Sequence, residues 1–597
     1  MAKEKLFKGG EFLITDALPE EVFTPEDYSK EQRLVAQSAE EFCTKELVAK
    51  MEQLREVNYP LLKELLVKAG ELGFLGADMP EVFGGSELDK VSSMLIGEKL
   101  CGGASGFMAS YGVQTGIGSL PIVLFGSPEQ KKKYLPRIAS AEIVAAYALT
   151  EPGHGSDALG AETKAVLSED GKYYLLNGTK QFITNAGFAD LFITYAQVDE
   201  TKFTSFIVER KWDGVSVDEE EKKMGMHGSS TRAVIYQNVK VPVENVLGEV
   251  GKGHIVALNT LNVGRFKIAP MVVGSAKTIF SEAVKYSKGR VQFGKPICEF
   301  GLIKQKIADM LIKIYATESM AYRTAHLLDM ALEGIDPTKP DAGAKTGEAI
   351  RKYALECSIN KVFGTEMLDF VVDECVQIFG GYGYIQDYPA EGAYRDSRIN
   401  RIWEGTNEIN RMLIVDTLMR AAMKGELPLL PVIQQATQDL LTFRPEMTEP
   451  EGTLEKEKKL VSMTKKIALL AAGAAVQKYM EKLAGQQEII AMISDIIIEI
   501  FAMESTLLRT LKKIQKEGEE KSEIQIAVTR VYINDAFAKA EWLAKQIFAS
   551  LAEGEELRTQ LMALKRLARN TPVNTVVLRR RIADSVIPLA RYHLTKM

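Results

Sequence analysis

The segment RIWEGTNEINR (residues 401–411) holds the side chain in this sequence that is best suited to acid–base chemistry. Gly405 and Thr406 indicate the start of a helix, and Glu404 comes just before them, beside the apolar Trp403. A carboxylate in apolar surroundings has a raised proton affinity, which suits a general base. On these residues alone, a surface acid in a loop is an equally good interpretation.

A glycine-rich segment, YALTEPGHGSDALG (residues 147–160), could contact a ligand through its backbone. Its pattern G-x-G-x-x-A superficially matches a dinucleotide fingerprint, but that motif needs a strand, a turn and a helix in a parallel unit. Short β-type runs follow here instead. The alternatives are a loop at a sheet edge, with the hydroxyls of Thr150 and Ser156 facing a ligand, and a plain turn.

The segment NGTKQFITNAG places Phe182 and Thr184 two residues apart, and therefore on one face of a strand. An aromatic ring and a hydroxyl on one face can flank a flat ligand ring and bind it by a hydrogen bond. Taken alone, such a pair is more often part of a core and its edge.

The segment GRVQFGKP places Arg290 directly after a helix end, with Gln292 and Phe293 beside it. A guanidinium group at such a place can hold a pyrophosphate through two parallel hydrogen bonds. Arginine is also a common solvated residue at helix ends, and without other motifs that interpretation is favoured.

The composition is that of an ordinary globular protein. Of the 597 residues, 46% are apolar and 26% are charged, and the formal net charge is −6. The absence of a long basic block argues against a nucleic-acid-binding protein. The five cysteines are scattered and show neither disulfide nor metal spacing, so we expect no metal site and a reducing compartment. No window reaches the ~18 apolar residues of a membrane span, and we expect a soluble, cytoplasmic protein.

Changes in hydrophobic periodicity divide the chain into several expected segments. Residues 24–143 have a helical pattern that begins near Pro25, and residues 144–249 consist of short strands with hairpin-like turns at 168–171 and 212–214. Because no helix of crossover length separates these strands, we expect an antiparallel sheet, forming a small barrel. The rest of the chain is predicted to form helices over 250–424, a connector over 425–452 and further helices over 453–597.

Five segments together, YALTEPGHGSD, NGTKQFITNAG, GRVQFGKP, VQIFGGYGY and RIWEGTNEI, resemble the acyl-CoA dehydrogenase family in sequence and in order. The resemblance covers roughly residues 24–424. It implies a multidomain α+β fold: an N-terminal helical domain, a central antiparallel β-barrel and a C-terminal four-helix bundle. The chain adds an extra C-terminal helical domain. With the LNVGRF segment (residues 261–266), this extension most resembles the very-long-chain type.

The resemblance also assigns roles to individual residues. Those lining the flavin ring of FAD would be Tyr147, Thr150, Phe182 and Thr184, with Thr406 nearby. The ADP portion would meet Arg290, Gln292 and Phe293 from one subunit and Gln377, Gly380 and Gly381 from its neighbour. Three residues would bind the substrate: Ser156, Asn262 and Arg265. Many members have Trp at the position of Phe182, and many medium-chain members have Asp at that of Asn262, which leaves the coenzyme A contacts there open.

The family places its catalytic base at one of two positions. Most members use the Glu of the EGT motif, which is Glu404 here. The isovaleryl type uses a Glu immediately before the arginine of the LNVGRF segment, where this chain has Gly264. Since glycine cannot titrate, the resemblance leaves Glu404 as the only candidate.

The expected reaction is FAD-dependent dehydrogenation of a long-chain fatty acyl-CoA in β-oxidation. Glu404 would remove the α-proton, the β-hydrogen would leave as hydride to the flavin, and trans-2-enoyl-CoA would form. Electrons would pass to an electron-transferring flavoprotein. An acyl-CoA oxidase, which reacts with oxygen, and a non-catalytic assembly or scaffold relative remain as alternatives. We expect a homodimer, because the additional domain has to bury its apolar helix face and would cover the surface that joins dimers into tetramers.

Overall fold

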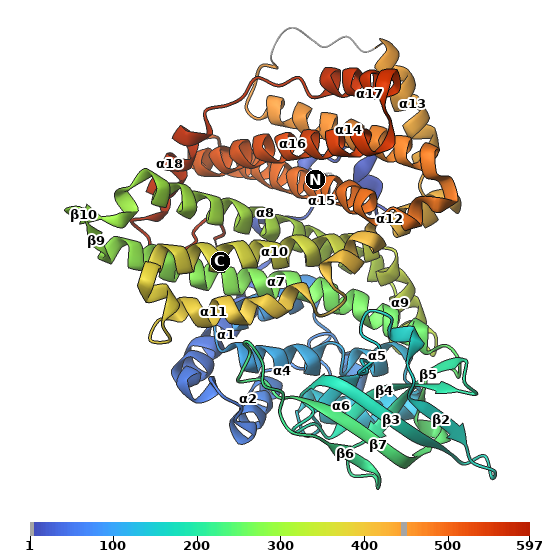
Figure 1. Cartoon of the computed structure of the whole chain (residues 1–597). Coiled ribbons are helices and arrows are strands. Elements are labelled where there is room, and N and C mark those ends of the chain that lie inside the picture. Colours follow the sequence, from blue (N-terminus) through green and yellow to red (C-terminus); the bar gives the residue numbers. More distant parts are fainter. Residues whose placement is uncertain (1–4, 443–449, 597) are drawn as a thin grey trace.

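The computed structural model describes residues 5–442 and 450–596. It has three layers (Figure 1): the N-terminal helices and a β-sheet, then long central helices, then the C-terminal helices. The expected order of a helical segment, a β segment, a second helical segment and an additional helical domain is confirmed.

The N-terminal layer consists of short helices. They are α1 (Lys30–Phe42), α2 (Tyr59–Glu71), α3 (Lys90–Leu100), α4 (Ser105–Thr115), α5 (Leu120–Phe125) and α6 (Pro128–Ala139). Of these, α3, α4 and α5 are largely buried. Ser127 caps α6 by accepting a hydrogen bond from the Gln130 N–H, as the sequence indicates. The proline at position 25 begins only a 3-10 turn, and the first α-helix starts after Ser29.

The sheet is mixed and open, so the expectation of a closed antiparallel barrel was wrong. Its strands are β1 (Ala145–Ala148), β2 (Lys164–Leu167), β3 (Tyr173–Thr184), β4 (Leu191–Val198), β5 (Lys202–Glu209), β6 (Val215–Val217), β7 (Thr231–Pro242) and β8 (Val246–Leu247). The path β6-β7-β3-β2-β4-β5-β8 has two ends that do not pair with each other, and β1 pairs with β4.

Two parallel pairings account for the difference. Both β1 and β2 run parallel to β4, on successive stretches of it. The other edge of β4 pairs with β5 along its whole length, so β1 and β2 share one edge. Residues 149–163 therefore form a loop inserted between two strands of the same direction. The turn at 168–171 is a hairpin, but that at 212–214 is not, because β6 pairs with β7 rather than β5.

The central layer is built on α7 (Gly253–Gly289), α8 (Gly301–Leu332) and α10 (Ala354–Phe379), which pack on one another, and α12 (Asn407–Met423), which packs on α10. Two shorter helices, α9 (Ala342–Arg351) and α11 (Pro389–Ser397), complete it. α10 ends before Gly380, and the helix end expected at Gly289 is confirmed. So is the start of α12 after Thr406, whose hydroxyl accepts a hydrogen bond from the Ile409 N–H.

The C-terminal layer covers one side of the central helices. It comprises α13 (Leu429–Thr442), α14 (Glu455–Tyr479), α15 (Gln487–Glu517), α16 (Glu523–Leu551), α17 (Gly554–Leu567) and α18 (Thr575–Val586). α13 lies inside the expected connector, so most of the described part of that stretch is helical. Residues 443–449 of the connector lie outside the described residues. The apolar face expected on α15 is buried, and α15, α16 and α18 all pack on α8.

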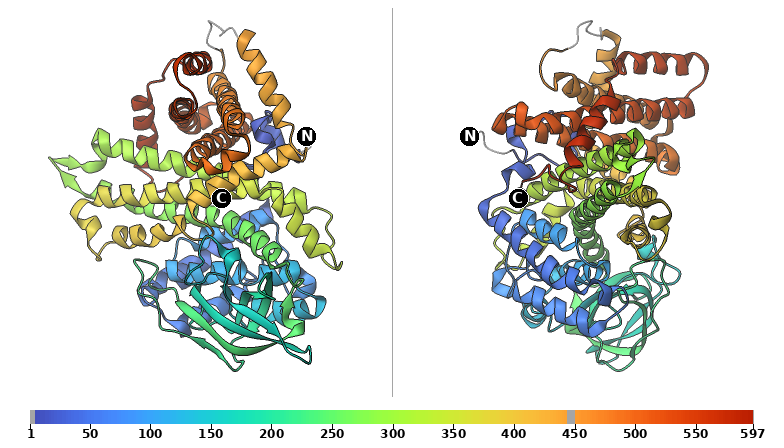
Figure 2. Two further views of the ribbon diagram at one scale, coloured as in Figure 1. Left: turned by 45° about the vertical axis from the view of Figure 1, so that its right-hand side comes forward. Right: turned by 90° about the vertical axis from the view of Figure 1, so that its left-hand side faces the viewer.

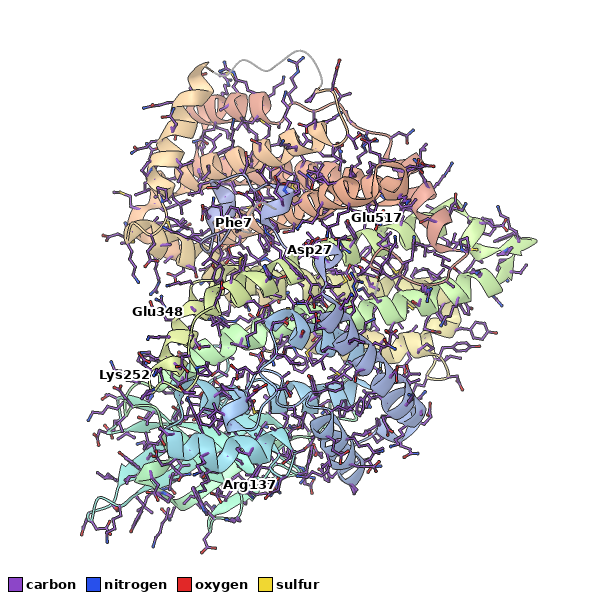
Figure 3. All side chains as sticks on the ribbon, turned by 180° about the vertical axis from the view of Figure 1, so that it is seen from behind. Phe7, Asp27, Arg137, Lys252, Glu348 and Glu517 are labelled. Carbon is purple, nitrogen blue, oxygen red and sulfur yellow. The ribbon has the colours of Figure 1, made fainter. Side chains whose placement is uncertain are left out.

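The first residues of the chain bind the C-terminal layer to the centre. The Tyr353 hydroxyl donates to the Phe7 carbonyl, and the rings of Phe12 and Phe501 lie 4.8 Å apart. Further on, Lys512 contacts Asp27 at 2.6 Å. Figure 2 shows this blue segment among the orange C-terminal helices, and Figure 3 labels Phe7 and Asp27 at the boundary between the layers.

Two helical stretches of the described residues are long and apolar enough to cross a membrane by length and composition alone. They are 105–125 and 455–485, and the apolar window is mostly buried in the first and about half buried in the second. Burial inside the fold is equally typical of the core helices of a protein that does not enter a membrane.

Candidate active site

The loop that carries Glu404 has an unusual backbone conformation. Glu404 has φ 55° and Gly405 has φ 80°, so two consecutive residues are left-handed. This conformation costs a non-glycine residue roughly 1–3 kcal/mol and persists only where surrounding structure enforces it. Here Arg265 Nε donates to the Glu404 carbonyl at 3.1 Å, and Asn410 Nδ2 donates to the Gly405 carbonyl at 2.8 Å.

The Glu404 carboxyl is directed into the protein. Its Oε2 is buried and has no hydrogen-bond partner among the described residues. Burial raises the pKa of Glu404 to about 7, while the positive charges of Arg265 and Lys361 oppose that rise. A buried carboxyl with a free oxygen and a pKa near neutrality is suited to accept a proton from a ligand.

The carboxyl lies against Gly264 on α7, the position where the sequence analysis excluded a second base. A Cβ atom at Gly264 would lie 2.6 Å from Glu404 Oε2, too close for the carboxyl to stay where it is. The glycine therefore provides the space that the base occupies.

We expect Gly264→Ala to reduce the rate of any reaction that uses Glu404 as base by about 10²-fold, because a displacement of about 1 Å has that effect in active sites. The rate of the chemical step in a single turnover is the measurement. Gly392→Ala on α11, where no atom lies within 4 Å of an added Cβ, is the matched control. A wild-type rate in Gly264→Ala would contradict this placement of the base.

Arg265 lies next to the base, as expected. It is buried, and its Nη1 donates to Asn262 Oδ1 at 3.0 Å. The Asn262 side-chain oxygen is therefore engaged within the protein, and Asn262 orients Arg265.

Phe182 presents an exposed aromatic ring on the outer face of the sheet. Phe182 is 61% exposed, and Ile183, between it and Thr184, is buried, so the pair lies on the outer face. A bulge between Lys180 and Ile183 gives Phe182 a φ of 58° and turns its ring outward. The bulge was not expected from the sequence.

Thr150 is held beside this face, because its carbonyl accepts a hydrogen bond from the Gln181 N–H at 2.8 Å. A buried ion pair, Lys180 with Glu151 at 2.6 Å, fixes the same loop to β3. Both residues belong to recognised segments, but their pairing could not be seen in the sequence. Tyr147 on β1 is buried, and its hydroxyl has no partner among the described residues.

Ser156 is exposed on the loop between β1 and β2, where Gly153 and Gly155 face open space. No helix that could begin a parallel βαβ unit follows β1, only a 3-10 turn before β2. The dinucleotide-fingerprint interpretation is therefore wrong. The segment is a loop at the edge of β4, and a ligand facing the Thr150 and Ser156 hydroxyls stays a prediction.

A second candidate site lies at the far end of α7. It is a pocket of about 450 Å³ lined by Tyr286, Arg290, Gln292, Ile297, Ile378, Phe379, Gly380, Gly381, Tyr382 and Ile385. The Arg290 guanidinium lies over the Tyr382 ring, 5.5 Å from its centroid. A pocket with a cation, aromatic rings and open glycines suits a nucleotide.

One chain thus brings together two groups that had been assigned to different subunits: Arg290 and Gln292 meet Gly380 and Gly381 in a single pocket. Which subunit supplies each of these groups to one cofactor stays a prediction. Two further predicted residues do not line the pocket: Gln377 is exposed on the last turn of α10, and Phe293 is 94% exposed at the tip of the hairpin between β9 (Val291–Gln292) and β10 (Lys295–Pro296).

Lys361 on α10 was not predicted as a site residue, yet it donates hydrogen bonds to the Gly405 carbonyl and to Asn407 Oδ1, directly after Glu404. The available signal was a lysine between apolar residues, in the run SINKVFG, which predicts a buried cation. Its partner residues lie more than forty positions away, so their identity was not accessible.

Comparison with known proteins gives matches along the whole chain. Acyl-CoA dehydrogenase domain models match residues 29–142 (N-terminal domain), 146–239 (middle domain) and 251–419 (C-terminal domain), and a second C-terminal domain model matches 463–566. The chain is 48% identical to a probable acyl-CoA dehydrogenase of Bacillus subtilis (strain 168), over 98% of both chains.

Two further matches bear on the cofactor and on the substrate. The crystal structure of an acyl-CoA dehydrogenase complexed with FAD from Bacillus anthracis has a TM-score of 0.97 and 48% identity, over 98% of this chain and 100% of that one. The very long-chain specific acyl-CoA dehydrogenase of Rattus norvegicus mitochondria is 39% identical, over 62% of this chain and 56% of that relative.

Proposed function

The chain belongs to the acyl-CoA dehydrogenase family and is an FAD-dependent oxidoreductase, and from this premise we propose that it oxidises long-chain fatty acyl-CoA to trans-2-enoyl-CoA in β-oxidation. The observation that carries the proposal is the buried Glu404 carboxyl, whose Oε2 has no partner and faces Gly264. Long chains are favoured because relatives at about 40% identity are named very long-chain specific.

The residues present fit FAD at both ends of the cofactor. The exposed Phe182 ring, with Thr150 and Thr184 beside it, would hold a flat ring system. The family resemblance adds Tyr147 and Thr406 to the surroundings of that ring. The ADP portion would enter the open pocket with Arg290, Gln292, Gly380 and Gly381. When bound, the flavin supplies the acceptor for the hydride that leaves the substrate β-carbon.

The chain's own residues account for the proton. Glu404 takes the α-proton of the thioester, and the neutral acid that results is favoured by the same burial that raises its pKa. The Glu404 N–H donates to no other group among the described residues, so it is free to bind the thioester oxygen as charge develops there. Arg265 and Asn410 hold the loop in position through its carbonyl oxygens.

The test is anaerobic bleaching of the yellow enzyme. Palmitoyl-CoA should reduce the bound flavin faster than butyryl-CoA does, and a series of chain lengths gives the optimum. Absence of bleaching with every acyl-CoA would overturn the proposal. If the reduced enzyme reoxidises rapidly with oxygen and not with an electron-transferring flavoprotein, an acyl-CoA oxidase is the correct assignment.

A cytoplasmic location, expected from the unpaired cysteines, is part of the same proposal.

The separation of the two candidate sites predicts an oligomer. Gly264, beside the base, and the end of α7, beside Arg290, are separated by 25 helical residues, or about 38 Å at 1.5 Å per residue. This exceeds the length of one FAD molecule. A cofactor whose ring lies near Glu404 must therefore meet the Arg290 pocket of a second copy.

We expect this oligomer to be a homodimer, because the C-terminal helices α15, α16 and α18 cover α8 and leave less of the central layer for further contacts. Light scattering coupled to gel filtration should give the mass of two chains. A mass near four chains would contradict the dimer, and a flavin-loaded monomer would contradict the shared site.

A further inference from the structure

Lys361 is a buried cation whose side-chain hydrogen bonds go to the loop that carries Glu404 and to the residue that begins α12. It is fully buried on α10, within an apolar run. No carboxylate of the described residues lies within 4 Å of its ammonium, so it forms no direct ion pair with any of them. A buried charge without a paired countercharge is costly, and its other interactions must offset that cost.

The ammonium instead binds the backbone and side chain that follow Glu404. Lys361 Nζ donates to the Gly405 carbonyl at 2.9 Å and to Asn407 Oδ1 at 2.7 Å. Asn407 is itself fixed, because its Nδ2 donates to Thr365 Oγ1 and to Glu366 Oε1. Lys361 therefore joins α10 to the left-handed turn and to the first residue of α12.

Lys361 and Glu404 also interact through their charges. Burial lowers the pKa of Lys361 to about 7, and the charge of Glu404 opposes this. Arg265 on α7 and Tyr147 on β1 also face Glu404, while Arg265, Glu408 and Glu366 face Lys361. In a site of low dielectric constant the charged form of each residue favours the charged form of the other, and the pair titrates as a coupled unit.

We propose that Lys361 is a positioning residue for the Glu404 base: its hydrogen bonds fix the turn that aims the carboxyl, and its positive charge favours the ionised carboxylate that accepts the proton. The inference rests on the proposed function of the site and adds a residue to it. It predicts that the ammonium is needed for its charge as well as for its packing.

Infrared spectroscopy can test the charge without any substrate. The carboxyl band that disappears in Glu404→Gln identifies the base, and its titration gives the protonation midpoint. In Lys361→Met the midpoint should rise by about one pH unit, because a cation that stabilised the carboxylate is gone. Lys361→Arg, which keeps the charge, should return it toward the wild-type value. Lys352→Met, at an exposed position before α10, is the matched control.

The same variants are then reduced anaerobically with palmitoyl-CoA. A midpoint one pH unit higher reduces the ionised fraction at pH 7 about fivefold, and the rate of flavin bleaching in Lys361→Met should fall by at least that factor. Only flavin-loaded protein bleaches, so a variant that binds less flavin shows a smaller amplitude and its rate can still be compared with wild type. If Lys361→Met does not fold, Lys361→Gln, which keeps a donor without the charge, takes its place.

An unchanged midpoint in Lys361→Met or Lys361→Gln, with or without a lower rate, would overturn the proposal, since a purely structural residue would behave in that way. Equal midpoints in Lys361→Arg and Lys361→Met would also overturn it. If no acyl-CoA bleaches the wild-type enzyme, the proposed function fails, but the infrared midpoints still decide the role of Lys361.

Discussion

Glu404→Gln is expected to slow flavin reduction by acyl-CoA by at least about 10³-fold, within the range by which general bases contribute to catalysis. The amide has nearly the shape of the carboxyl but cannot take the α-proton, and Gly264 offers no replacement group. Because burial opposes ionisation of Glu404, the neutral amide should be accommodated without loss of stability. Stopped-flow absorbance under anaerobic conditions measures the rate.

Two controls separate the role of the base from binding and folding. Glu556→Gln makes the same substitution at an exposed position on α17 and should leave the rate near wild type. Flavin content and acyl-CoA affinity of Glu404→Gln should match the wild-type values. Reduction of its flavin at a near wild-type rate would show that another group removes the proton.

Helix ends and the segment that carries the base were predictable because they depend on neighbours in sequence. Thr406 caps α12 through the backbone three residues on, and Gly380 ends α10 because its φ of 60° suits glycine. Glu404 was identified from apolar neighbours and from the resemblance of its segment. Each of these features is determined by residues that lie within a few positions of one another in the sequence.

Contacts between distant residues were not predictable in the same way. Strand composition predicted the β segment but not the order of its strands in the sheet. That order depends on the 149–163 loop, which brings β2 back to the edge of β4 that β1 also uses. The bond from Lys361 to Gly405 joins residues 44 positions apart. The pocket that unites Arg290 with Gly381 likewise depends on where α7 and α10 end side by side, which no local pattern encodes.

The second large effect that we expect is the loss of FAD on substitution of Arg290, which lines that pocket. Arg290→Ala should lose FAD during gel filtration, because the variant lacks the guanidinium that can bind the pyrophosphate with two charged hydrogen bonds. Such bonds contribute roughly 1.5–3 kcal/mol each, so the loss of both should lower flavin affinity by about 10²- to 10⁴-fold. The loss should increase with salt, which screens the remaining ionic contacts. The ratio of flavin to protein absorbance after the column is the measurement.

Variants at the end of α7 separate the effect of the positive charge from that of the guanidinium geometry. Arg290→Lys keeps the positive charge but not the planar pair of donors, so it should retain flavin less well than wild type and better than Arg290→Ala. Lys285→Ala, an exposed cation on the last turns of α7 that pairs with Glu282, should retain it fully. Because the pocket of one chain would serve the ring site of another, flavin loss in Arg290→Ala should be accompanied by a weaker dimer. Full flavin content in Arg290→Ala at high salt would exclude this pocket as the site of the ADP portion.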